Sequence, residues 1–80
     1  MSRKVVLYGK PDCHLCHEAE ALLAHLQQEF AFSVEKIDIL GNLVLEAKYR
    51  YAIPVIVVNG RLELPAPILE RELRAALRSL

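Results

Sequence analysis

The two cysteines of this chain, Cys13 and Cys16, lie where an apolar segment gives way to a pattern typical of an amphipathic helix. At a helix start, unpaired backbone N–H groups and the positive end of the helix dipole favour a thiolate over a thiol. A second cysteine three residues later lies on the same side of the first turn, within reach of a short disulfide. This placement predicts a dithiol that opens and closes, which indicates redox exchange.

The composition favours one compact domain over residues 1–80. Eighty residues are too few for two domains, and a chain that is 54% hydrophobic and 25% charged is expected to form an ordered core. Ten basic and ten acidic residues show no clustering of positive charge, so no nucleic-acid partner is expected. The N-terminus has no leader pattern and no apolar run reaches the roughly 18–20 residues that span a bilayer, which predicts a cytoplasmic protein without membrane contact.

Hydrophobic periodicity predicts seven elements in the order β-α-β-α-β-β-α. They are a strand at 5–8, a helix at about 14–29, a strand at 32–39, a helix at about 43–51, strands at 55–58 and 61–64, and a last helix after Pro65 and Pro67. The first helix has an apolar stripe of Leu15, Ala19, Leu22, Leu23, Leu26 and Phe30. The last helix has a stripe of Leu69, Leu73, Ala76, Leu77 and Leu80, and its charged residues are expected to face solvent.

The order of the elements limits how they assemble. Residues 43–45 alone favour a strand, but the residues that follow them favour a helix. Asn59-Gly60 predicts a tight hairpin turn, because both positions tolerate positive φ. The first two strands need a right-handed crossover and are therefore expected to be parallel. One central sheet with helices on both faces would bury every apolar stripe, which predicts an α/β fold.

The cysteine pair has three interpretations. A Cys-x-x-Cys near a β-α-β pattern is typical of a thioredoxin-like redox motif, in which the more exposed Cys13 attacks and Cys16 resolves the mixed disulfide. The pair is alternatively half of a zinc site completed by His14, His17 or His25, or simply two buried cysteines. Zinc sites usually take a second ligand pair from further along the chain, and no Cys or His follows His25. Redox exchange is therefore the preferred interpretation.

The polar residues around the cysteines are weighed in the same way. His14 either favours the Cys13 thiolate when protonated, or faces solvent without a role. His17 and His25 are expected on the helix surface, and Asp12 in the turn or at the helix cap.

Pro54 restricts the residue before it to an extended conformation and precedes a β-branched strand. An X–Pro bond is cis in only about 5–6% of cases in folded proteins. On the residues alone, a trans bond is therefore the default.

These residues together resemble the glutaredoxins, and more closely the small glutaredoxin-like proteins of the thioredoxin fold. The segment from Tyr8 to Cys13 is similar to the Tyr-Ser-Lys-x-x-Cys of that family, and residues 13–16 stand in place of its Cys-Pro-Tyr-Cys. Residues 53–55 match its Val-Pro segment, and residues 58–61 match its hairpin. The resemblance implies a thioredoxin-like, glutaredoxin-type α/β fold with a four-stranded mixed sheet and helices on both faces.

The resemblance also implies roles for individual residues. It implies catalysis by Cys13 and Cys16, and substrate binding by Tyr8, Lys10, Ile53 and Pro54. Lys10 would stabilise the thiolate or hold a glutathione carboxylate, the Ile53 backbone would pair with an extended substrate, and Pro54 would be cis. The implied activity is reduction of protein or small-molecule disulfides, with electrons from glutathione or a flavoprotein reductase and with no bound cofactor or metal.

The chain departs from this family just before the last helix. Glutaredoxins have Gly-Gly and an acidic pair there, which hold the amino group of glutathione, whereas this chain has Leu64-Pro65-Ala66-Pro67-Ile68. Without these carboxylates, charge-assisted hydrogen bonds worth roughly 1.5–3 kcal/mol each are lost. Leu15 also replaces the usual tyrosine and leaves a more apolar rim. The electron donor therefore stays open, and a non-catalytic module that binds an extended strand beside Pro54 is an alternative function.

Overall fold

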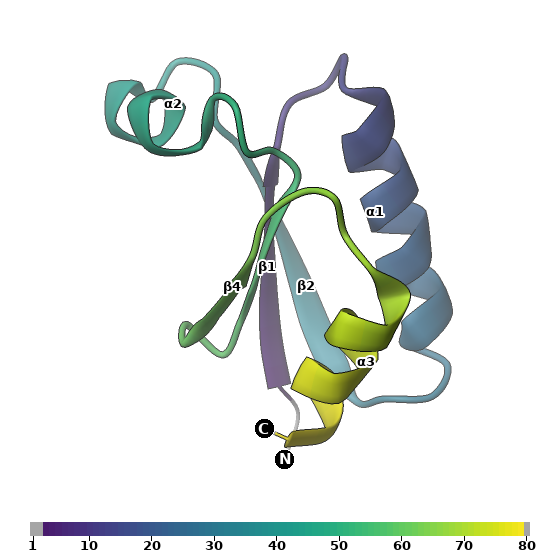
Figure 1. Ribbon diagram of the computed structural model, residues 1–80. Helices are drawn as coiled ribbons and strands as arrows, with labels where there is room; N and C mark the ends of the chain where they lie inside the picture. The colour runs from purple at the N-terminus through teal and green to yellow at the C-terminus, as the bar shows by residue number, and fades with distance from the viewer. Residues whose placement is uncertain (1–2, 80) are drawn as a thin grey trace.

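The computed structural model describes residues 3–79 and has its seven elements in the predicted order (Figure 1). They are β1 (Arg3–Gly9), α1 (His14–Leu26), β2 (Phe32–Asp38), α2 (Leu43–Tyr49), β3 (Val55–Val58), β4 (Leu62–Leu64) and α3 (Glu70–Ser79). Within residues 3–79, no helix is both long enough and apolar enough to cross a bilayer.

Several elements are shorter than predicted. α1 ends at Leu26 instead of residue 29, because the next residues form a tight turn in which Glu29 donates its N–H to the Leu26 carbonyl at 3.0 Å. β2 ends one residue early at Asp38, and α2 ends at Tyr49 instead of residue 51. Hydrophobic periodicity locates the middle of an element better than its ends, because the terminal residues form turn hydrogen bonds instead of regular helix or strand ones.

Two leucines that were predicted to be buried are exposed. Leu15 in the first turn of α1 is 54% exposed, and Leu69 is 42% exposed. Leu69 precedes α3, where its carbonyl accepts the N–H groups of Glu72 and Leu73 at 3.1 Å each, so it lies at the cap of the helix. Leu80, predicted to belong to the same stripe, lies outside the described residues.

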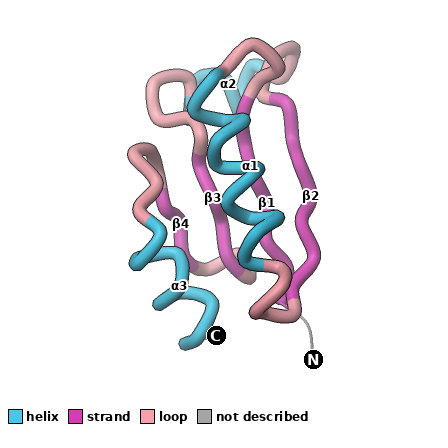
Figure 2. The backbone as a smooth tube through the Cα atoms, turned by 90° about the vertical axis from the view of Figure 1, so that its right-hand side faces the viewer, coloured by secondary structure: helices cyan, strands magenta, loops and turns pink. Residues whose placement is uncertain are grey.

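The four strands form one mixed sheet in the order β2-β1-β3-β4 (Figure 2). β1 and β2 are parallel, as the crossover predicts, and β3 is antiparallel to both β1 and β4. The β3–β4 hairpin turns at Asn59 and Gly60, whose φ angles are 55° and 66°. Both positive values are those that a tight hairpin turn requires, so this turn is confirmed.

The two faces of the sheet are covered unequally. α1 and α3 lie on one face and α2 lies on the other (Figure 1). Alternate residues of β1 and β3 point to opposite faces, as strand geometry requires. The α1/α3 face holds the larger core, which includes Val5, Leu7, Leu23, Leu26, Phe32, Ile56, Val58, Leu73 and Leu77. The α2 face holds a smaller cluster of Ile39, Tyr49 and Val55, packed against Tyr8, Leu45, Ala52, Ile53 and Val57.

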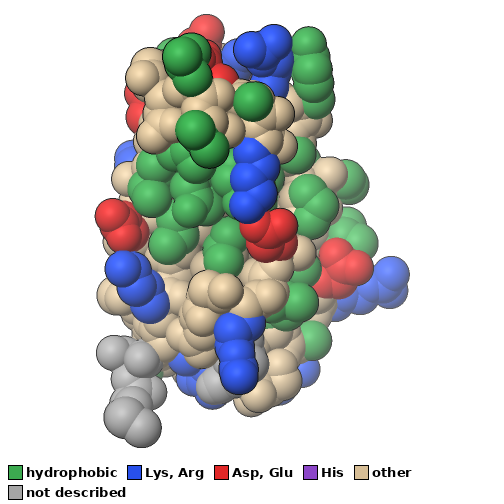
Figure 3. Space-filling view, turned by 90° about the vertical axis from the view of Figure 1, so that its left-hand side faces the viewer, with side chains coloured by type: hydrophobic (Ala, Val, Ile, Leu, Met, Phe, Trp, Pro, Cys, Tyr) green, Lys and Arg blue, Asp and Glu red, His purple; other side chains and the backbone are tan. Residues whose placement is uncertain are grey.

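The α2 face leaves hydrophobic side chains open to solvent. Figure 3 views the molecule from this side and shows them gathered on and below α2. On α2 itself, Leu43 is 82% exposed and Val44 is 74% exposed. The helix therefore buries only one narrow side against the sheet.

The charged residues of α3 do not all face solvent, contrary to the prediction. The Arg74 guanidinium, 23% exposed, donates two hydrogen bonds to the Glu29 carboxylate at 2.7 and 2.8 Å and one to Glu70 at 2.8 Å. The hydrogen bonds from Arg74 lower the pKa of Glu29, and those to Glu29 and Glu70 raise the pKa of Arg74. This pairing ties the turn after α1 to α3.

Candidate redox site

Cys13 is the N-cap residue of α1. Its backbone is extended, with φ −110° and ψ 110°, and its Sγ accepts the N–H of Cys16 at 3.2 Å. Helix N-caps are usually Ser, Thr, Asp or Asn, whose side-chain oxygen accepts such an N–H. Here the sulfur takes the place of that oxygen, so Asp12, predicted in the turn or at the cap, lies in the turn. The position favours negative charge on the Cys13 sulfur.

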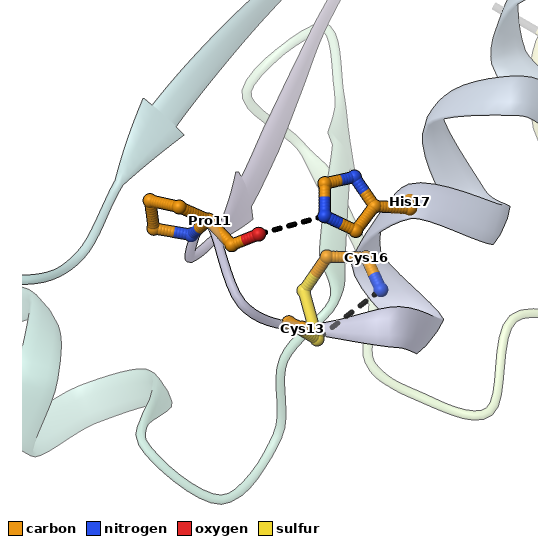
Figure 4. Close-up of a disulfide and its surroundings, with 4 residues drawn as sticks. All are labelled: Pro11, Cys13, Cys16 and His17. Carbon is orange, nitrogen blue, oxygen red and sulfur yellow. Dashed lines mark hydrogen bonds between the residues drawn. A yellow bond between two sulfur atoms is a disulfide. The ribbon is translucent and has the colours of Figure 1, made fainter.

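Cys13 and Cys16 are joined in a disulfide, with their Cα atoms 5.2 Å apart (Figure 4). Cys13 is partly exposed, whereas Cys16 is 6% exposed and faces the core side of α1. The pair therefore offers one sulfur to solvent and keeps the other one turn inside. This asymmetry is the arrangement that an attacking and a resolving cysteine need.

Gly9, at the end of β1, lies directly against Cys16. A Cβ atom at this glycine would be 2.8 Å from the Cys16 Sγ and 3.1 Å from its Cβ, closer than van der Waals contact allows. The sequence predicts a turn after Gly9, but the contact with Cys16 is visible only in three dimensions. The absent side chain lets β1 approach the disulfide.

The two histidines beside the cysteines have different partners. The His14 side chain is 88% exposed, and its Nε2 lies 2.8 Å from a Glu18 carboxylate oxygen, so the solvent-facing interpretation is favoured. His17 is exposed, as predicted, but its Nε2 lies 2.7 Å from the Pro11 carbonyl oxygen (Figure 4). No sequence pattern predicts this contact, because it joins a helix residue to the turn before the helix.

The structure places Tyr8 and Lys10 differently with respect to the disulfide. The Tyr8 ring stacks on the Tyr49 ring, with centroids 4.7 Å apart, on the face covered by α2. Tyr8 is therefore brought together with Tyr49 rather than with Cys16, which belongs to α1 on the opposite face. Lys10 is exposed and lines a cleft of about 310 Å³ that reaches Cys16.

This cleft is strongly charged. Besides Lys10 and Cys16 it is lined by Leu7, Gly9, Pro11, His17, Glu20, Lys36, Ile37 and Asp38. Lys36 continues the inward row of β2 that begins with Phe32 and Val34, and its Nζ lies 3.0 Å from a Glu20 carboxylate oxygen. A largely solvent-exposed ion pair thus lines the same cleft as Cys16.

The Ile53–Pro54 peptide bond is cis, as the resemblance implies, and Pro54 is fully buried. Val55 pairs with Tyr8, so Pro54 lies beside the end of β1. The Ile53 N–H donates to the Tyr49 carbonyl at 3.2 Å. Pairing of an extended substrate with Ile53 would therefore have to use the Ile53 carbonyl.

An apolar groove of about 390 Å³ lies beside Pro54, on the side of α1 away from the charged cleft. Its lining residues are Leu15, Glu18, Ala19, Leu22, Pro54, Ala66, Pro67 and Ile68. The one charged member, Glu18, is already engaged by His14. The Ala66 N–H donates to the Ala52 carbonyl at 3.1 Å, which fixes the segment before α3 next to Pro54, and the Ala66–Pro67 bond is also cis. Two departures from the glutaredoxin pattern, Leu15 and the segment before α3, thus meet in one groove.

The zinc interpretation needs further ligands near the two cysteines. Among residues 3–79, no three His, Cys, Asp or Glu side chains lie close enough together to hold a metal ion. His14 and His17 make contacts with Glu18 and the Pro11 carbonyl instead.

Comparison with known proteins places these features in a family. Residues 4–78 match the family model described as Glutaredoxin-like domain (DUF836). The chain is similar to the solution structure of protein Ne2328 from Nitrosomonas europaea, with 37% identity, a TM-score of 0.84, and coverage of 96% of this chain and 93% of that one. It is also similar to the X-ray structure of target protein XcR50 from X. campestris, with 33% identity, a TM-score of 0.79, and coverage of 95% and 97%.

More distant structures share only the fold. A mutant thioredoxin from Halobacterium salinarum is 22% identical, with a TM-score of 0.77 over 98% of this chain and 74% of that one. None of the curated proteins matches the chain. The family match over residues 4–78 and the two homologous structures show that this chain belongs to the glutaredoxin-like domain family, and its fold is thioredoxin-like.

Proposed function

We propose that this domain is a thiol–disulfide oxidoreductase that reduces disulfides through Cys13 and Cys16. The observation that carries the proposal is the asymmetry of the pair. Cys13 caps a helix and is partly exposed, Cys16 is buried one turn later, and the two sulfurs are already joined. A helix cap favours the thiolate that attacks, and burial keeps the resolving sulfur away from external disulfides.

The reaction begins with the reduced protein. The Cys13 thiolate attacks one sulfur of the substrate disulfide, and the second substrate sulfur leaves as a thiolate that takes a proton from water. Cys16 then loses its proton and attacks the Cys13 Sγ, which releases the first substrate sulfur as a thiolate. The substrate has gained two electrons, and the protein ends as the Cys13–Cys16 disulfide, the form seen in this structure.

The groove beside Pro54 favours one class of substrate. A disulfide that reaches Cys13 must lay its flanking residues near Leu15, which lies between the two cysteines and is 54% exposed. Because every other lining residue except Glu18 is also apolar, we propose a protein disulfide flanked by apolar residues. Pro54 would form the floor of this site, and the Ile53 carbonyl would bind the substrate backbone.

Lys10 and Tyr8, also proposed to bind substrate, do not line the apolar groove, and Tyr8 stacks on Tyr49 instead. Lys10 lies at the mouth of the charged cleft, where it would attract the carboxylate of a small thiol such as glutathione. We propose glutathione or a flavoprotein reductase as the electron donor, with no bound cofactor. We also propose that the protein acts in a reducing compartment such as the cytoplasm, where disulfides are usually transient and catalytic.

The test is reduction of insulin disulfides by the wild-type protein and by two variants. Cys13→Ser is expected to abolish the reaction, because the attacking sulfur is gone. Cys16→Ser is expected to accumulate a covalent adduct with the substrate, detectable by mass spectrometry, because the adduct cannot be resolved. Reduction that continues in Cys13→Ser would contradict the proposal.

A redox titration separates the enzyme from the binding module. We expect the pair to cycle at roughly −200 to −270 mV, the range of glutaredoxins and thioredoxins. A pair that stays reduced at every physiological potential would favour a module that binds an extended strand without using its cysteines.

A further inference from the structure

We propose that His17 is a positioning residue for the Cys13–Cys16 pair, whose imidazole fixes the turn that leads from β1 into α1. This inference rests on the proposed function, because it concerns the reactivity of Cys13. It assigns a role to a residue that the sequence placed merely on the helix surface.

His17 holds the chain on both sides of Asp12. Its Nε2 lies 2.7 Å from the Pro11 carbonyl oxygen, and its backbone N–H donates to the Cys13 carbonyl at 3.1 Å (Figure 4). A carbonyl oxygen only accepts hydrogen bonds, so Nε2 must carry the hydrogen and donate it. Both the Nε2–H tautomer and the protonated ring can therefore make this bond.

The turn needs such an anchor because burial does not hold it. Lys10, Pro11 and Asp12 are all exposed. Yet the turn begins at Gly9, which lies against the Cys16 Sγ, and ends at Cys13, which caps the helix. A displacement of the turn would therefore disturb the surroundings of both sulfurs at once.

The charges around His17 favour a role through its hydrogen bond rather than through its charge. The cleft that His17 lines also contains Lys10 from the turn, Glu20 from α1, and Lys36 and Asp38 from β2. Glu20 and Lys36 form an ion pair at 3.0 Å. Side chains of both signs, with Asp12 of the turn as a third acidic one, thus surround His17, whereas its hydrogen bond to Pro11 acts on the turn directly.

His14 provides a matched control on the same helix. It is the same residue type, lies in the first turn of α1, and is likewise exposed. Its Nε2 contacts Glu18 on the helix surface and not the turn before Cys13. Removing His14 takes away the partner of Glu18 near Cys13 but leaves the Pro11 contact intact.

The experiment measures alkylation of Cys13 by iodoacetamide at pH 7 in a Cys16→Ser background. His17→Leu and His17→Ala are expected to slow the reaction roughly three- to tenfold, the effect of losing one hydrogen bond. His17→Gln, which keeps a side-chain N–H donor, is expected to stay within about twofold of the parent, and so is His14→Leu. Thermal unfolding of each variant confirms that it is folded; Ala suits an exposed helix position, so at least one variant without the donor is expected to fold.

Two results would overturn the inference. One is an unchanged rate in both His17→Leu and His17→Ala. The other is a His17→Gln rate as slow as that of His17→Leu, because that would assign the effect to charge or ring packing. Failure of the proposed function would give a different result in the same experiment. Cys13 of the parent protein would be alkylated no faster than a free cysteine, and its alkylation rate would rise only near pH 8.5, roughly the pKa of an unperturbed thiol.

Discussion

The two sides of the first half of α1 differ sharply in character, and only one of them is lined by a cysteine of the disulfide. On one side lies the charged cleft, with the Glu20–Lys36 ion pair next to Cys16. On the other lies the apolar groove, where exposed Leu15 faces Pro54 and Ile68. The difference teaches that one helix presents a different surface on each side. Under the proposed function, the cleft side would surround the resolving sulfur, and the groove side would contact the substrate that the attacking sulfur meets.

The largest effect is the difference in the free energy of unfolding between alanine variants of two leucines in α1. Leu23 is 1% exposed in the core, so Leu23→Ala should lower the free energy of unfolding by about 2–5 kcal/mol through lost burial and the remaining cavity. Leu15 faces the groove, so Leu15→Ala should change it by less than about 0.5 kcal/mol. Urea unfolding of the oxidised proteins measures both. A comparable loss for both variants would mean that Leu15 is a core residue and not part of a binding surface.

The next effect concerns the cleft side. Gly9→Ala places a methyl group 2.8 Å from the Cys16 Sγ, and such overpacking is expected to destabilise the oxidised protein by about 1–3 kcal/mol. The loss should be smaller in the reduced protein, because a free thiol can rotate away. Urea unfolding of both redox forms tests this, with Lys10→Ala as a control on the neighbouring exposed residue. An equal loss in both forms would show that the disulfide does not fix the contact.

A smaller effect is expected for substrate choice on the groove side. Leu15→Glu should lower kcat/KM roughly five- to tenfold for a peptide disulfide with leucine beside its cysteine, because about 1–1.4 kcal/mol of apolar contact is lost. A matched peptide with serine at that position has no leucine contact to lose, so its kcat/KM should fall less. Leu43→Glu, on the exposed side of α2, is the control and should leave both rates unchanged. Equal losses for the two peptides would mean that the groove does not select substrates.

The smallest effect concerns the ion pair between α3 and the turn after α1. Arg74 ties α3 to Glu29 beyond the end of α1, and this hydrogen bond lowers the pKa of Glu29. A carboxylate with a lowered folded-state pKa stabilises the fold above its unfolded value, here near 4.5, and loses that contribution as the pH falls through the folded value. The Tm difference between wild type and Arg74→Met should therefore be larger at pH 7 than at pH 3. A difference that does not change with pH would assign the effect to packing alone.

Much of the fold could be predicted because its signals are local. The seven elements, the hairpin at Asn59-Gly60 and the parallel first pair of strands follow from periodicity, turn chemistry and the handedness of the crossover. The predicted ends were wrong by one to three residues, and the apolar stripe wrongly placed Leu15 in the core, whereas the resemblance implied an apolar rim at this position. Helical spacing places Leu15 on the apolar stripe, but it does not tell where along the helix the core stops.

The sequence by itself determined that a cysteine pair would start a helix after a buried strand, because the spacing and the residue types act within a few positions of one another. Only the tertiary structure decided what surrounds that pair. It brought Gly9 against Cys16, His17 to the Pro11 carbonyl, and Leu15 into one groove with the segment before α3. These contacts depend on how the elements pack together, and periodicity within one element carries no information about its neighbours.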